Sequence, residues 1–502
     1  MSWLVGAPVI LPLAVAALLF VLQGRREAQR VISTTSTALL LTLSAILLYR
    51  VSEGGILVAQ FGEWRAPFGI SFVADHLSAI MVVITGVMAV ATAVYALRDI
   101  DPDREALGYH PLFQVLLAGI NGAFLTGDLF NMYVWFEVLL IASFVLLTLG
   151  NRREQLEGGI KYVAVNLVSS LVFLGAIGLV YGVTGTLNMA DLAIRLPQAP
   201  GGLVSVIAML FMVAFGIKAA LFPLFFWLPA SYHTPPQAIA AIFAGMLTKV
   251  GVYALIRVFT LLFVHDVAYT HTILLWIAGF TMVTGVLGAA AQNDFRKILS
   301  FHIISQIGYM IMGLALYTPL ALLGAVFYLA HHIIVKANLF LVAGIVRRYA
   351  GSFDLDRLGG LYRRAPFLSV LFLVPAFSLA GFPPLSGFWA KLVVVLAAAD
   401  VGAWPIVAVA LVVGLLTIYS MTKIWQAAFW SPLPEGVELA PRPSGLLYAP
   451  VIGLALLTLA IGFWSGPFLA VAEAAATELM DPTAYVRAVL GDAAAAAIGR
   501  TP

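Results

Sequence analysis

One stretch decides how this chain folds: Phe215-Gly216-Ile217-Lys218-Ala219-Ala220-Leu221-Phe222-Pro223-Leu224-Phe225-Phe226-Trp227-Leu228-Pro229. It predicts a membrane-spanning helix with Lys218 near its middle. An ammonium group in hydrocarbon costs at least about 2.5–3.5 kcal/mol on insertion scales, so the lysine needs a reason to be there. Pro223 removes a backbone N–H and clashes with the carbonyl of Ala219, so we expect the helix to open beside Lys218. Broken helices at membrane depth are tolerated only inside protein or along a wet cavity, so the stretch indicates an ion or proton path.

The composition of the whole chain is that of a polytopic membrane protein. Of its 502 residues, 62% are hydrophobic and only 10% are charged, and the mean hydropathy is +1.02. A soluble protein carries about 25% charged residues. The net charge of +3 without a dense basic run argues against nucleic acid as a partner. Cysteine is absent, which excludes disulfides and cysteine-ligated iron–sulfur clusters.

The apolar segments predict an all-α fold of about fourteen transmembrane helices, because a hydrocarbon core of roughly 30 Å needs about 20 apolar residues per helix. The expected spans are 2–22, 32–50, 75–97, 110–127, 129–149, 160–182, 204–228, 237–260, 270–291, 297–316, 320–346, 367–395, 404–428 and 446–469. The first has no basic region before it, so we interpret it as a retained span rather than a signal peptide. Residues 468–490 are too polar to span, and we expect this tail at the membrane surface or on a partner.

Basic residues concentrate in every second connection between these spans. The odd-numbered connections contain Arg25, Arg26, Arg30, Arg98, Arg104, Arg152, Arg153, Lys161, Arg296, Lys297, Arg347, Arg348, Arg357, Arg363, Arg364 and Arg442. The even-numbered ones contain only Arg65 and Arg195, with Arg50 at the edge of a span. By the positive-inside rule the odd connections are cytoplasmic, so both termini are expected on the outer side.

Glu137 lies in the middle of the fifth expected span. It could be a neutral, hydrogen-bonded acid that only fixes packing. Alternatively it is an anion paired with a cation on another helix, and Lys218 is the natural partner. Pairing favours both charged forms whereas desolvation opposes them, so such a pair can switch. A proton or Na⁺ that reaches the glutamate would remove the counter-charge of the lysine.

Two further groups lie within the eighth and tenth spans. Lys249 is a second mid-span cation, which could extend to an interface, although its small neighbours favour burial between helices. His302 shares one helix face with Ser305 and Gln306, at spacings of three and four residues. A lone histidine often has only a structural role, but the polar neighbours Ser305 and Gln306 are also consistent with a water-filled path.

The eleventh span contains His331, His332 and Lys336. His332 and Lys336 are four residues apart and share one helix face, whereas His331 points about 100° away. Histidine can be neutral or charged near neutral pH, which suits a proton relay. A metal site is the weaker interpretation, because no third histidine or carboxylate lies nearby in the sequence.

The twelfth span contains Gly381-Phe382-Pro383-Pro384-Leu385-Ser386-Gly387, and Lys391 follows. Two prolines and two glycines predict another opening, so the arrangement around Lys218 occurs twice. Paired broken helices indicate an inverted-repeat transporter. The candidate relay is therefore Glu137, Lys218, Lys249, His302, His332, Lys336 and Lys391. Its mostly positive sign argues against a simple cation pore, whose lining would be acidic.

Six stretches carry a resemblance to a known family. They are Asp128–Phe130 with Glu137, Gly216–Lys218 with Pro223, His233–Pro236, Lys249–Tyr253, His332–Phe340 and Gly381–Phe388. Over essentially its whole length the chain resembles the antiporter-like membrane subunits shared by Mrp-type multisubunit cation/proton antiporters and respiratory complex I. The resemblance implies two inverted five-helix repeats with broken seventh and twelfth helices. It divides the chain into N-terminal helices (1–109), a first repeat (110–262), a second repeat (263–430) and a last helix with an interfacial tail (431–502).

The same resemblance implies roles for the candidate residues. Glu137 and Lys218 match the Glu–Lys pair of the first repeat, and Lys391 matches the terminal lysine of the broken twelfth helix. Lys249, His332 and Lys336 match the central relay. D-type Mrp subunits are the most similar, because Lys391 stands where one class of complex I subunit has glutamate. The tail from Ala484 to Leu490 also looks like the ending of D-type subunits.

The implied function is that of a secondary transporter subunit, not an enzyme, without a cofactor. It would exchange cytoplasmic Na⁺, or another monovalent cation, for external H⁺ in a bacterial cytoplasmic membrane. The expected partners are lipid and the other Mrp subunits, of A, B, C, E, F and G type. Two alternatives remain at this point: a proton-pumping subunit of a complex I type NADH or ferredoxin:quinone oxidoreductase, and a structural membrane scaffold.

Overall fold

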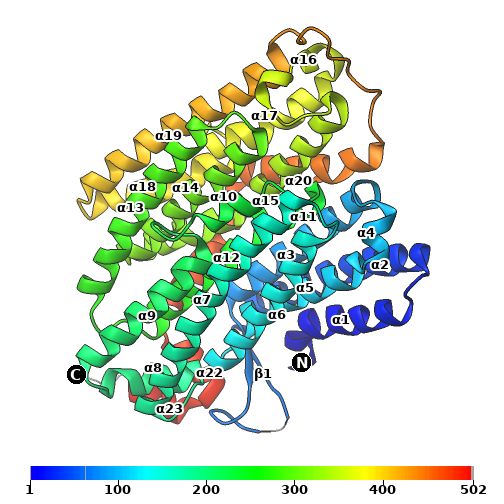
Figure 1. The fold of residues 1–502 in the computed structure, drawn as a ribbon. Coiled ribbons are helices and arrows are strands. Elements are labelled where there is room, and N and C mark those ends of the chain that lie inside the picture. The colour runs from blue at the N-terminus through cyan, green and yellow to red at the C-terminus, as the bar shows by residue number, and fades with distance from the viewer. Residues whose placement is uncertain (1, 63, 499–502) are drawn as a thin grey trace.

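The fold of this chain is a bundle of long helices, described by a computed structural model over residues 2–62 and 64–498. Figure 1 shows the helices side by side, with α1 and α2 at one edge and α19 at the other. In this described part, twelve helices are long and apolar enough to cross a membrane. The remaining two expected spans are α5, of 17 residues, and the broken pair α17 and α18, of 15 residues each. The predicted all-α multi-pass fold is confirmed.

The helices of the first half are α1 (Ser2–Val21), α2 (Arg26–Gly54), α3 (His76–Asp99), α4 (Pro102–Ala106), α5 (Tyr109–Leu125), α6 (Leu129–Thr148), α7 (Arg153–Thr184), α8 (Met189–Arg195), η1 (Leu196–Gln198), α9 (Gly201–Ala219), α10 (Trp227–Ser231), α11 (Gln237–Ile242), η2 (Phe243–Leu247) and α12 (Thr248–Leu261). Those of the second half are α13 (Val267–Ala291), α14 (Phe295–Leu316), α15 (Pro319–Ala350), η3 (Leu355–Arg357), α16 (Leu361–Arg364), α17 (Pro366–Ala380), α18 (Ser386–Asp400), α19 (Trp404–Trp425), η4 (Gln426–Trp430) and α20 (Gly445–Phe463). The tail forms α21 (Ser465–Met480), α22 (Thr483–Leu490) and α23 (Asp492–Ile498).

A small β-hairpin was not predicted from the sequence. Strands β1 (Leu57–Gln60) and β2 (Ser71–Ala74) are antiparallel, with Leu57 opposite Ala74. The hairpin marks one end of the bundle, which we call the hairpin end. The other end, where the connections with most arginines lie, is the arginine-rich end. Directly after β2, Asp75 caps α3 by accepting the backbone N–H of Ser78.

Both expected breaks are present, and their backbones follow the same path. After α9, Ala220 has a φ of +58°, and the N–H of Leu221 donates to the carbonyl of Gly216 over 2.9 Å. After α17, Gly381 has a φ of +96°, and the N–H of Phe382 donates to the carbonyl of Phe377 over 3.0 Å. The side-chain N–H of Trp227 satisfies the opened carbonyl of Ile217 at 3.0 Å. Broken seventh and twelfth spans are thus confirmed.

A second pair of matching connections relates the two halves. At the hairpin end, the N–H of Leu129 donates to the carbonyl of Leu187 and that of Met189 to the carbonyl of Gly127. At the arginine-rich end, the N–H of Phe295 donates to Phe353 and that of Leu355 to Asn293 in the same way. The same pairing at opposite ends of the bundle is what two inverted repeats produce.

The C-terminal tail packs against helices of its own chain. Helix α21 packs on α15 and α3 of this same chain. Its small residues Ala472, Ala475 and Ala476 are buried there, because they allow close helix approach. Figure 1 shows α22 and α23 beside α8, near the hairpin. The chain therefore covers much of its own tail.

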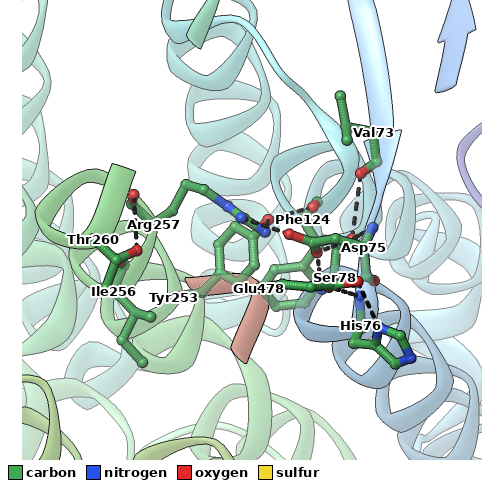
Figure 2. A network of polar contacts seen from close by, with 10 residues as sticks. All are labelled: Val73, Asp75, His76, Ser78, Phe124, Tyr253, Ile256, Arg257, Thr260 and Glu478. Carbon is green, nitrogen blue, oxygen red and sulfur yellow. Dashed lines mark hydrogen bonds and ion pairs between the residues drawn. The ribbon is translucent and has the colours of Figure 1, made fainter. Parts of the chain in front are cut away.

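A polar network holds this tail to the hairpin end (Figure 2). Arg257 of α12 and Asp75 form a buried ion pair with 2.6 Å between Nη1 and Oδ2. The guanidinium also donates to the hydroxyl of Tyr253 at 3.2 Å and lies over the ring of Tyr485 in α22. Beside it, the first N–H of α3 donates to the carboxylate of Glu478 over 2.9 Å. The network joins α3, α12 and the tail.

Candidate functional site

Glu137 and Lys218 come together as expected, but not in direct contact. Ser170 of α7 lies between them: its hydroxyl donates to Oε1 of Glu137 and accepts from Nζ of Lys218, at 3.0 Å for the second bond. Lys218 is buried and lies over the ring of Phe136, whereas Glu137 is half-buried. The sequence did not point to Ser170, because one serine on an apolar helix is an ordinary residue there.

The helix that contains Lys218 ends just after it, and α12 packs directly against the backbone at this point. Lys218 lies one residue before the end of α9, where the Cβ of an alanine at Gly251 would come within 2.8 Å of its backbone carbon. Helix α12 can therefore pack this closely against the break only because Gly251 has no side chain. A small cavity of about 10 Å³ borders Lys218, Tyr162 and Asn166, which is close to the space that one water molecule needs.

Lys249 is fully buried between helices, as the small neighbours predicted, and does not reach an interface. Its Nζ donates to the carbonyl of Ala244 over 2.6 Å. Ala244 belongs to η2, one turn of π-helix between α11 and α12. Turns of π-helix are rare in proteins, and many of those that occur lie at functional sites. The sequence did not indicate this turn.

The centre of the bundle contains ionisable groups without protein partners. Within the described part of the chain, no protein atom hydrogen bonds to Nζ of Lys336 or to either ring nitrogen of His332 and His302. All three side chains have no solvent exposure. Ser305 and Gln306 add further unpartnered polar atoms on the face of His302. A buried polar group without a partner is costly, so this centre has the character of a path that small polar species can enter.

Lys391 lies beyond the second break, on α18. Its Nζ donates to the carbonyl of Ala380 at the end of α17 over 3.0 Å and lies 5.3 Å from the ring centre of Tyr309. The amine of Lys391 therefore lies at the opening that Gly381 and the prolines create.

The seven predicted residues come from six helices, α6, α9, α12, α14, α15 and α18, and we call this set the row. Every one of these residues except Glu137 is a cation when protonated, and neighbouring cations repel one another in a protein interior of low effective dielectric. In the described residues, no cluster of three or more His, Asp or Glu could hold a metal ion.

Sequence comparison places this architecture in a family. The model of the family "NADH:quinone oxidoreductase/Mrp antiporter, TM" matches residues 126–417, which include both breaks and all seven residues of the row. This range is more than half of the chain. The chain therefore belongs to this family of transmembrane subunits.

Individual relatives narrow the similarity further. The chain is 47% identical to the D-type subunit of the Na(+)/H(+) antiporter of Alkalihalophilus pseudofirmus, over 98% of this chain and 100% of the relative. It is 41% identical to the D-type subunit of the Na(+)/H(+) antiporter of Bacillus subtilis, over 96% and 98%. One chain in the structure of the Mrp complex from Dietzia sp. DQ12-45-1b superposes with a TM-score of 0.91, at 33% identity over 98% and 100%. The chain is thus similar to D-type subunits along its entire length.

Proposed function

We propose that this chain is the D-type membrane subunit of an Mrp Na⁺/H⁺ antiporter, a secondary transporter subunit rather than an enzyme. The exchange runs between cytoplasmic Na⁺ and external H⁺. One observation supports this function most strongly: the central residues His302, His332 and Lys336 are ionisable, fully buried and, within the described residues, without protein hydrogen-bond partners. In an interior with only a structural role, such groups would be hydrogen-bonded or replaced by apolar residues, because each buried polar group without a partner costs free energy.

The Glu137–Ser170–Lys218 set acts as the first switch of the path. With Glu137 ionised, the hydroxyl of Ser170 transmits its charge to Lys218 and favours the ammonium form. When a cation or proton neutralises Glu137, desolvation then favours loss of a proton from Lys218. Glu137 is half-buried, so it is accessible to a charge brought from outside this chain.

The central row continues the transfer from Lys218 to Lys391. Lys249, His332 and Lys336 exchange protons through water, because water is the smallest group that can serve the unpartnered nitrogens of His332 and Lys336. Lys391 ends the row at the second break. Moving one charge across about 100 mV is worth about 2.3 kcal/mol. This drive equals a shift of between one and two pKa units, since one unit is about 1.4 kcal/mol, so modest changes of environment are sufficient.

The orientation follows the distribution of arginine. The arginine-rich end faces the cytoplasm and the hairpin end faces outward, so both termini lie on the outer side of a bacterial cytoplasmic membrane. We assign the first repeat to residues 110–262 and the second to 263–430, in agreement with the matching connections at Gly127 and Asn293. The partners are lipid and the other Mrp subunits, of A, B, C, E, F and G type. No cofactor is needed, and Na⁺ and H⁺ are the transported ions.

The test measures Na⁺-dependent proton flux in membrane vesicles that contain the complex with Glu137→Ala or Lys218→Ala. Both variants should lose the flux while the complex still assembles. Near-normal flux in either variant would remove this pair from the mechanism, and would favour a scaffold role for the chain.

Co-purification separates the antiporter from a redox pump of the same family. The tagged chain, extracted in mild detergent, should bring several small hydrophobic subunits and one larger homologous chain. Flavin-containing and iron–sulfur partners would instead assign the row to a redox-driven proton pump.

A further inference from the structure

His331 forms a polar cluster that lies apart from the central row. It is on α15, next to His332, but points toward α18 because successive helix positions differ by about 100°. Its Nδ1 lies 2.8 Å from the hydroxyl of Ser386, at the first residue of α18. Its Nε2 is buried and has no protein partner in the described residues. The ring therefore has one bonded and one free nitrogen.

Ser386 continues the hydrogen-bonded chain toward the second break. Its hydroxyl lies 2.9 Å from that of Ser378 in α17, which also accepts the backbone N–H of Gly387 over 3.1 Å. The two serines lie on either side of the opening at Gly381. The chain of bonds thus connects α15 to both halves of the broken twelfth span.

The approach of the three helices here depends on a missing side chain. A Cβ at Gly387 would lie 1.7 Å from the carbonyl oxygen of Ser378 and 2.8 Å from Cε1 of His331. Lys391 is one helical turn beyond Gly387 and shares its face. The same opening therefore brings the imidazole of His331 and the ammonium of Lys391 to one cluster.

The charged neighbours of His331 are all basic. They are Lys391 on α18, one helical turn beyond Gly387, and His332, the next residue of α15. The ring of Tyr328 contacts that of His331 edge to face at 5.7 Å, and Tyr309 of α14 stacks on Tyr328 and lies beside Lys391. In the described residues, no carboxylate forms an ion pair with His331. A proton added here has no counter-charge, so it is held only until another base takes it.

We propose that His331 is a further proton-carrying residue of this subunit, and that Ser386 and Ser378 link it to Lys391 across the second break. The inference rests on the proposed function of the row and adds a branch to it. His271 also has a buried Nε2 without a protein partner in the described residues, so the free nitrogen alone does not mark a relay. His331 differs because the hydroxyl on its Nδ1 leads on to Ser378 at the second break, which gives a proton bound at Nε2 a route onward.

The proton balance of the step is complete. A proton from the central row binds Nε2 of neutral His331, and the ring then releases its Nδ1 proton to Ser386. Ser386 gives its own hydroxyl proton to Ser378, and Ser378 gives one through a water molecule to the neutral amine of Lys391. Each serine receives one proton and loses one. The net change is one proton gained by Lys391 and one lost by the row residue that donated to His331.

The test uses the assembled antiporter in proteoliposomes and records Na⁺-driven proton flux as a function of pH. His331→Gln retains a hydrogen bond to Ser386 but cannot carry a proton. We expect it to lower the flux by about 10²-fold, the scale of a lost proton-transfer group. The matched control is His271→Gln: within the described residues, His271 on α13 is also buried, bonded through Nδ1 to the hydroxyl of Thr270 and unpartnered at Nε2, but no chain of hydroxyls leads from it to Lys391. This control should retain wild-type flux.

Serine variants keep the test decisive if His331→Gln does not assemble. Ser386→Ala should lower the flux and move its pH optimum, whereas Ser386→Thr, which keeps the hydroxyl, should restore both. A merely structural role would leave the pH profile of assembled variants unchanged, and that result would overturn the proposal.

Lys391→Ala distinguishes this inference from the proposed function. If Lys391→Ala abolishes flux but His331→Gln or Ser386→Ala has the wild-type flux and pH profile, only the His331 branch is wrong. If Lys391→Ala also transports normally, the row itself is wrong and the His331 branch is overturned with it.

Discussion

Glu137 and Lys218 are joined through the hydroxyl of Ser170, which donates to the carboxylate and accepts from the ammonium. A direct ion pair would hold both charges firmly, because each partner stabilises the other at contact distance. The intervening hydroxyl weakens this attraction while it keeps the two groups coupled. The pair can therefore change its protonation without separating two charges in contact.

The first prediction concerns this bridge. Ser170→Ala should lower Na⁺-dependent proton flux by about tenfold, since it removes one link worth about 1.4 kcal/mol, whereas Ser170→Thr should keep most of the flux. Ser169→Ala is the control, because the neighbouring hydroxyl donates only to the carbonyl of Ala214. Equal flux in Ser170→Ala and Ser169→Ala would show that the bridge has no role.

A second prediction concerns the close approach at the twelfth span. Gly387→Ala should destabilise the protein by about 1–3 kcal/mol, as overpacking does, because its Cβ would overlap the carbonyl oxygen of Ser378. Gly175→Ala has no atom within 4 Å of the new Cβ and should stabilise its helix by about 0.5–1 kcal/mol. Thermal unfolding of the purified complex compares the two. An unchanged melting temperature for Gly387→Ala would contradict the observed packing.

The buried pair of Asp75 and Arg257 gives a third prediction (Figure 2). Asp75→Asn should cost about 3–5 kcal/mol, because it leaves the guanidinium buried without a counter-charge. The double variant Asp75→Asn with Arg257→Met should be more stable than Asp75→Asn alone. A double-mutant cycle of thermal stability measures the difference. Additive effects of the two changes would mean that the pair is not coupled.

A fourth prediction concerns pH at the arginine-rich end. Burial raises the pKa of Glu105, but hydrogen bonds from Arg30 and Arg26 outweigh this effect and hold it below the usual value. A carboxylate with a lowered pKa in the folded state stabilises the protein above its ordinary pKa of about 4.3. This stability is lost as the pH falls through the folded value.

Glu105→Gln lacks this contribution at every pH. Its melting temperature should therefore lie below that of the wild type near neutral pH, and the two should converge in acid. A difference that stays constant from neutral to acid pH would contradict the assignment.

The sequence alone predicted the elements whose signal is local. Lys218 with Pro223, and Lys391 with two preceding prolines, indicated both broken helices because proline acts on its own turn of helix. Glu137 was placed beside Lys218 because a buried charge needs a partner. Burial of Lys249 followed from its small neighbours.

What could not be predicted depends on contacts between distant segments. Ser170 and Ser386 are ordinary helix residues until tertiary packing places them beside Glu137 and His331. The ion pair of Asp75 and Arg257 joins positions far apart in the chain. The tail was expected at the membrane surface or on a partner, since its alternating polar residues do not reveal which surface covers the apolar ones.

The central claim is that the buried row of this subunit carries protons, and Lys336 tests it most directly. Lys336→Met keeps the length of the side chain but removes its charge, and we predict that it abolishes Na⁺-dependent proton flux in vesicles containing the assembled complex. Lys423→Met is the control. Lys423 also lies within a span, but it is in the last turn of α19 and donates to the carbonyls of Ala290 and Gln292. Wild-type flux in Lys336→Met would contradict the account.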